Sequence, residues 1–138
     1  MHAFERLLVW QKAHELTLRV YRATDDSPGA PYPHLATQLR RASTAIAASI
    51  AEGTAIDAQR KLGRYVESAI SYVAELQYYI RLAADLGALS VHDRATLEAR
   101  ADEVVRMLAG LRRKVRQRNG RPEELLDEVP AAVPTTSE

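Results

Sequence analysis

The chain has 138 residues, no cysteine, and 19 basic residues against 18 acidic ones, which leaves a net charge of +1. This length suits one domain with its own hydrophobic core. The absence of cysteine excludes disulfides and thiolate metal sites and fits a reducing cytoplasm, and the balanced charge by itself predicts neither a nucleic acid nor an acidic partner. No apolar run approaches the roughly 18 residues of a membrane span. The N-terminal residues MHAFERLLVW lack the cleavage site of a secretory signal, so we expect a cytoplasmic protein with no membrane partner.

Four segments repeat apolar residues at alternating steps of three and four, which is the spacing of one helix face, and none shows the alternation of a β-strand. The first segment covers about 4–24. Its inner stripe consists of Val9, Ala13, Leu16, Val20 and Ala23. A turn-rich stretch with three prolines between positions 28 and 33 follows, and proline in a helix interior removes a backbone donor. The second predicted helix therefore begins at about Pro33.

The second predicted helix, about 33–53, is unusually thin. Over 40–53 it reads RRASTAIAASIAEG, in which only Ile46 and Ile50 are large and apolar. Small side chains let helices approach closely, with Trp10 and the tyrosines filling the space above them. Because Ala45 and Ala48 lie off the inner stripe, a second face of this helix is also small and uncharged. Two interpretations follow, namely tight packing inside one bundle or an additional contact between subunits.

The third predicted helix, about 59–86, carries Tyr65, Tyr72 and Tyr79 at every seventh position, with Tyr78 beside them. Tyrosine is enriched at interfaces because its body is apolar and its tip polar. Base stacking on nucleic acid usually needs interleaved basic residues, whereas the charges around these tyrosines are mixed. The pattern favours a core edge or an oligomer interface over a stacking platform.

The fourth predicted helix covers about 91–118. Gly87 fits a left-handed cap that ends the third helix, and Ser90 with Asp93 fits a capping box that opens the fourth. After Gly120 the helical period disappears and prolines return. The sequence therefore predicts an all-α, up-down-up-down four-helix bundle over 1–121 and a mobile, acidic, proline-containing tail over 122–138.

Four stretches occur in order over roughly 4–116, and together they resemble one known family. They are FERLLVWQKAHELTLRVYRAT, QLRRASTAIAASIAEGT, ESAISYVAELQYYIRLAADLGALS and RMLAGLRRKV. The sequence resembles the four-helix-bundle proteins encoded by intervening sequences in bacterial 23S ribosomal RNA genes, although the family pattern has Asn where this chain has Ser49. The resemblance implies a homo-oligomer, a pentameric ring of bundles, and no established biochemical activity.

The chain shows no motif for metal binding or catalysis. No Glu-x-x-His pair exists and no two histidines stand four apart, so the ligands of a di-metal bundle are missing. No G-x-S-x-G and no glycine-rich phosphate loop occurs. We therefore expect no metal, no cofactor and no enzymatic activity, with an unrecognised polar pocket near Arg41 and Glu52 as the alternative.

Several polar side chains fall among the small residues and need partners on another helix or subunit. Arg41 and Glu52 are eleven residues apart, about 16 Å along a helix, which is too far for contact within it. Pairing with other helices or subunits would set the alignment of these elements relative to one another. A small pocket for an anionic ligand is the alternative. Arg40 and Glu75 belong to the same group of polar residues. The candidates for an oligomer interface or for buried polar positions are Arg40, Arg41, Ala45, Ala48, Glu52, Tyr65, Tyr72 and Tyr79.

A basic cluster stands at the end of the fourth helix. Its members are Arg112, Arg113, Lys114, Arg116, Arg118 and Arg121. Cations at a helix C-terminus complement the helix dipole, and the acidic residues over 123–128 could neutralise them. In a ring, repeated clusters would add their fields and bind phosphates. We expect a homo-oligomer that binds RNA or other nucleic acid through this cluster, with a protein-interaction scaffold as the alternative.

Overall fold

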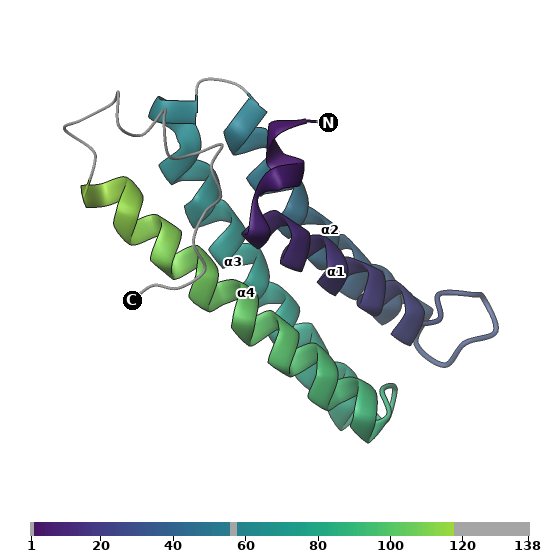
Figure 1. The fold of residues 1–138 in the computed structure, drawn as a ribbon. Helices are drawn as coiled ribbons and strands as arrows, with labels where there is room; N and C mark the ends of the chain where they lie inside the picture. Colours follow the sequence, from purple (N-terminus) through teal and green to yellow (C-terminus); the bar gives the residue numbers. More distant parts are fainter. Residues whose placement is uncertain (1, 56–57, 118–138) are drawn as a thin grey trace.

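A computed structural model of the chain describes residues 2–55 and 58–117. A short 3-10 helix, η1 (Ala3–Arg6), precedes four α-helices, and no strand occurs in these ranges. The helices are α1 (Leu8–Ala23), α2 (Pro33–Ala55), α3 (Ala58–Asp85) and α4 (Val91–Gln117). Successive helices run in opposite directions, and the α1–α2 loop and the α3–α4 turn lie at the same end (Figure 1). The predicted all-α four-helix bundle is confirmed, while the tail over 122–138 lies outside the described residues.

The first predicted helix is two elements rather than one. Leu7 has an extended backbone, with φ −80° and ψ 125°, between η1 and α1. The Glu5 side chain accepts the backbone amide of His2 at 2.8 Å, and the Gln11 side-chain amide donates to the Glu5 carbonyl at 2.8 Å. These bonds stabilise the break, and Leu7, with 1% of its surface exposed, is buried in the core.

The other helix boundaries agree with the capping residues. Gly87 has a φ of +76°, and the amides of Gly87 and Ala88 donate to the carbonyls of Ala84 and Ala83 at 3.0 and 2.8 Å. This left-handed cap ends α3. The Asp93 amide donates to Ser90 Oγ at 3.0 Å, which satisfies a donor in the first turn of α4.

The core lies where the inner stripes meet. The helical period predicts inner stripes at 35, 39, 42, 46, 49 and 53 of α2, at 62, 66, 69, 73, 76, 80 and 83 of α3, and at 97, 101, 104, 108, 111 and 115 of α4, and all of these residues are buried. Of the predicted stripe on α1, only Ala23 is half-buried. The largest fully buried side chains are Leu7, Leu16, Leu39, Ile46, Ile50, Leu62, Leu76, Ile80, Leu97 and Leu108. The helical period therefore located most of this core, while Leu7 and Ile50 lie outside the predicted inner stripes.

The thin part of α2 packs tightly inside the bundle. A Cβ added to Gly53 would lie 2.8 Å from the Cβ of Tyr65 on α3, so only glycine fits there. On the other side, the Thr17 hydroxyl of α1 donates to the Ser43 carbonyl at 3.0 Å, and Ser43 is fully buried. The tight-packing interpretation is thus confirmed within one chain, and the subunit contact stays a prediction.

Candidate assembly faces and basic helix end

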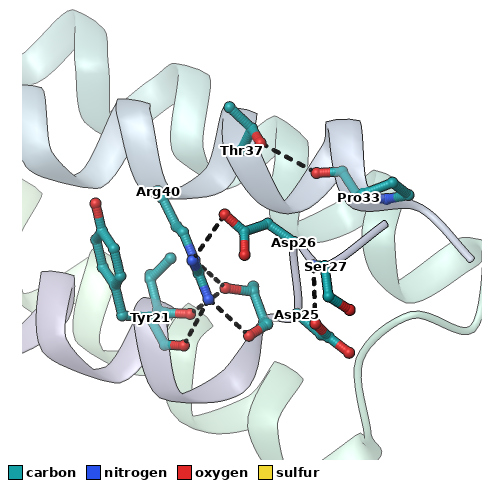
Figure 2. A network of polar contacts seen from close by, with 9 residues as sticks. Tyr21, Asp25, Asp26, Ser27, Pro33, Thr37 and Arg40 are labelled. Carbon is teal, nitrogen blue, oxygen red and sulfur yellow. Dashed lines mark hydrogen bonds and ion pairs between the residues drawn. The ribbon is translucent and has the colours of Figure 1, made fainter. Parts of the chain in front are cut away.

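Arg40 of α2 binds the C-terminal end of α1. Its Nη2 donates to the carbonyls of Tyr21 and Thr24 at 3.2 and 2.9 Å, and its Nε donates to Thr24 Oγ1 at 2.9 Å. Nη1 forms an ion pair with Asp26 at 3.1 Å, and the guanidinium lies 4.6 Å from the centre of the Tyr21 ring (Figure 2). Carbonyls at a helix C-terminus lack helical partners, so Arg40 satisfies them and closes the α1–α2 loop.

The loop beside Arg40 carries a second local contact. The Ser27 amide donates to Asp25 Oδ1 at 3.0 Å, as Figure 2 shows. This bond, together with the Ser27 side chain and the charge of Arg40, lowers the pKa of Asp25. The ionised carboxylate therefore favours this loop conformation, and the loop presents negative charge to Arg40.

A polar hollow lies next to Arg40. It is open, has a volume of about 500 Å³, and is lined by Tyr21, Asp26, Thr37, Arg40, Arg41, Thr44 and Ala45. The Asp26 carboxylate pairs with Arg40 there, while Arg41 has no ion pair among the described residues. Glu52 does not line this hollow, and the predicted anion pocket near Arg41 and Glu52 stays a prediction.

Arg41, Glu52 and Glu75 are exposed on the single chain. They are therefore not buried within the bundle of one chain. The reason is rotational, because Arg40 points toward α1 while Arg41, one residue on, is turned by about 100° away from the core. Their assignment to a subunit interface stays a prediction.

The remaining interface candidates divide between core edge and surface. Ala48 is exposed and Ala45 half-buried on the outer side of α2. Tyr65 and Tyr79 are half-buried on α3; Tyr65 lies against Gly53 and Tyr79 packs on the core. Tyr72 remains 36% exposed. Of the three regularly spaced tyrosines, Tyr72 is the one left most available to a partner.

The opposite side of the bundle, between α1 and α4, is covered by ion pairs. Lys12 pairs with Glu103 at 3.6 Å, and Arg100 lies 3.8 Å from both Glu15 and Glu103. Arg19 pairs with Glu15 at 3.8 Å. We call this surface the α1/α4 face; Lys12, Glu15, Arg19, Arg100 and Glu103 have ion-pair partners there within the chain.

The basic cluster at the end of α4 is partly neutralised by α3. Glu67 Oε1 lies 3.5 Å from Arg112 Nη1, and Glu67 Oε2 lies 3.1 Å from Arg116 Nη2. Arg113 is exposed, Lys114 is half-buried, and both make interactions of their own. Arg118 and Arg121 lie outside the described residues. Sequence reasoning missed Glu67 because 45 and 49 positions separate it from its two partners.

Histidines and metal ligands form no cluster in the described part of the chain. No group of three or more His, Cys, Asp or Glu side chains there could hold a metal ion. His14 stacks on Trp10 with ring centres 4.9 Å apart, and the backbone amide of His2 belongs to the η1 cap. Nor does any described helix combine the length and apolarity that crossing a membrane requires.

A family model described as 23S rRNA-intervening sequence protein matches residues 5–110. The chain belongs to this family. No curated protein matches the sequence. The range shared with the 23S rRNA-intervening sequence proteins contains the whole of α1, α2 and α3 and ends within α4, before Arg112. The candidate assembly residues therefore lie inside the matched range, and the basic cluster follows it.

Proposed function

We propose that this 23S rRNA-intervening sequence protein acts as a non-enzymatic homo-oligomeric bundle. The observation that carries the proposal is the contrast between its sides, since α2 and α3 expose small residues, Tyr72 and unpartnered charges. Tyr and Arg are enriched at protein interfaces, and small residues let helices of two subunits approach closely. A pentameric ring, implied by the resemblance to the family, would repeat this surface five times.

Light scattering on the purified full chain tests this proposal. A homopentamer has five times the 15.4 kDa mass of the monomer. We expect that mass to persist on dilution into the low micromolar range, as for a stable oligomer. A monomer at all concentrations would contradict the proposal.

Nucleic-acid binding through the end of α4 is a second candidate function. Four basic residues, Arg112, Arg113, Lys114 and Arg116, lie within five positions there, and Glu67 is the carboxylate that α3 places against two of them. A positive local balance favours phosphate contact, and ring assembly would multiply it. The Glu67 pairing also supports the alternative of a scaffold that binds no nucleic acid.

Fluorescence anisotropy of a labelled structured RNA distinguishes nucleic-acid binding from the scaffold that binds no nucleic acid. If the chain binds nucleic acid, Glu67→Gln should raise its affinity for RNA, because two arginines lose the carboxylate that neutralises them. Arg112→Gln combined with Arg116→Gln should lower the affinity and make it less dependent on salt concentration. The matched control is Arg81→Gln with Arg106→Gln, which removes two exposed arginines from α3 and α4 outside the cluster. No RNA binding by the wild type at low salt favours the scaffold.

A further inference from the structure

Two helices carry outward stripes with the same spacing and the same order of charge along the chain, arginine first and glutamate last, and the two helices run antiparallel (Figure 1). The α2 stripe is Arg41, Ala45, Ala48 and Glu52, and the α3 stripe is Arg64, Ser68, Ser71 and Glu75. Both follow steps of four, three and four, so each stripe lies along one side of its helix. Within these stripes only Ala45 and Ser68 are half-buried, and the other six residues are exposed.

The four charges of the stripes have no partner among the described residues. Over 2–55 and 58–117, the side chains of Arg41, Glu52, Arg64 and Glu75 form no ion pair or hydrogen bond. Elsewhere among the described residues, several exposed charges pair with a neighbour, as Arg81 does with Asp85 at 3.0 Å, whereas Arg22 on α1 is exposed and has no ion pair. Each stripe thus presents one free cation and one free carboxylate about 16 Å apart, with small residues between them.

The two stripes stand at nearly the same height along the bundle. Gly53 of α2 abuts Tyr65 of α3, and the two helices run antiparallel. Counted from that contact, Glu52 lies within one helical turn of the level of Arg64, and Arg41 within one turn of the level of Glu75. A second copy placed beside the first therefore needs almost no axial shift to align the stripes.

We infer that the α2 stripe of one copy packs antiparallel against the α3 stripe of the next copy; this inference rests on the proposed homo-oligomer. In that register Arg41 faces Glu75 of the next copy, and Glu52 faces its Arg64. Ala45 and Ala48 then face two serines, and small residues on both sides let helix axes approach to about 8 Å. Tyr72, beside the α3 stripe, adds apolar area to the contact.

This contact joins two different surfaces of the chain, and such a contact forms a closed ring where the rotation between successive copies closes. The number of copies is what the mass measurement below determines. An α2–α2 contact would instead be symmetric and would stop at two copies. Exposed ion pairs contribute only about 0–1 kcal/mol each, so the charges specify partner surface and register while the buried area supplies affinity.

Charge reversal tests the inference. The first variant combines Arg41→Glu with Glu52→Arg, the second combines Arg64→Glu with Glu75→Arg, and the third carries all four changes. We expect the first two to fall to the 15.4 kDa monomer and the third to recover the wild-type mass, because both pairs are then restored with inverted sign. The matched control, Asp102→Arg with Arg106→Glu, inverts an exposed ion pair on α4 and should leave the mass unchanged.

Native mass spectrometry gives the subunit number, and circular dichroism confirms that each variant is helical. If a reversal variant loses its helicity, Ser71→Trp replaces it, since this exposed residue lies in the middle of the α3 stripe.

A folded first variant that keeps the wild-type mass would overturn the inference, because an α2–α2 contact tolerates that double reversal. Failure of the fourfold variant to recover the mass would also overturn it. A monomeric wild type would overturn the proposed function as well, whereas the other two results leave the oligomer standing.

Discussion

The α1/α4 face and the surface formed by α2 and α3 use their charges in different ways. On the α1/α4 face, Lys12, Glu15, Arg100 and Glu103 form ion pairs with one another. On α2 and α3, four exposed charges have no partner among the described residues, and alanines and serines separate them. Both surfaces belong to the same bundle and have similar helical patterns. This difference is what the proposed contact between two copies of the chain rests on.

The largest expected effect is on assembly, from Ala48→Trp. Ala48 is exposed at the centre of the α2 stripe, so an indole there blocks close helix approach without disturbing the core. We expect the oligomer to become monomeric while helicity and Tm of the chain remain those of a folded bundle. Ala99→Trp on exposed α4 is the control and should keep the wild-type mass. If Ala48→Trp and Ala99→Trp had equal masses, the α2 surface would be no more important for assembly than the α4 surface, which contradicts the comparison.

The next effect is on stability, from Gly53→Ala. The added Cβ would lie 2.8 Å from the Tyr65 Cβ, which is fixed to the α3 backbone and cannot rotate away. Overpacking of this kind costs about 1–3 kcal/mol, more than the roughly 1 kcal/mol that alanine gains over glycine in a helix. Urea unfolding should report a lower midpoint. Gly29→Ala, with no atom within 4 Å of its new Cβ, should leave that midpoint nearly unchanged.

A smaller effect separates two adjacent arginines of α2. Arg40→Ala leaves the Tyr21 and Thr24 carbonyls without their donor and should lower the free energy of unfolding by about 1–3 kcal/mol. Arg41→Ala removes an unpartnered side chain and should change it by less than about 0.5 kcal/mol. Both variants are to be measured in a chain that also carries Ala48→Trp, so that assembly does not contribute to the free energy of unfolding. A cost for Arg41→Ala as large as that for Arg40→Ala would show that Arg41 has a partner in its own chain.

The smallest effect is expected on the α1/α4 face. Lys12→Met removes an ion pair that is about one-third exposed, and such pairs contribute about 0.2–1 kcal/mol. The loss should shrink further near 1 M salt, where screening is strong, and the oligomer mass should not change. Thermal melts at low and high salt measure the first effect, and light scattering measures the second. A change in the oligomer mass would indicate that the α1/α4 face takes part in the subunit contact, which contradicts the proposed contact between α2 and α3.

The tertiary structure decided which polar residues act together. Arg40 and Arg41 are adjacent and chemically identical, yet one clamps the end of α1 and the other is exposed. Glu67 meets Arg112 and Arg116 only because α3 and α4 fold back on each other. Neither outcome follows from the helical period, since a period of 3.6 defines the apolar side of a helix but not which neighbour covers its flanks.

The sequence by itself determined the four helices, their inner stripes and most of their ends. Repeated apolar spacing, Gly87 and Ser90 act locally, so their consequences can be predicted without knowing the fold. The close approach of Gly53 to Tyr65 and the alignment of the two unpaired stripes depended on the tertiary structure. Each of these depends on residues far apart in the chain, and such contacts exist only once the core has fixed how the helices are rotated and aligned.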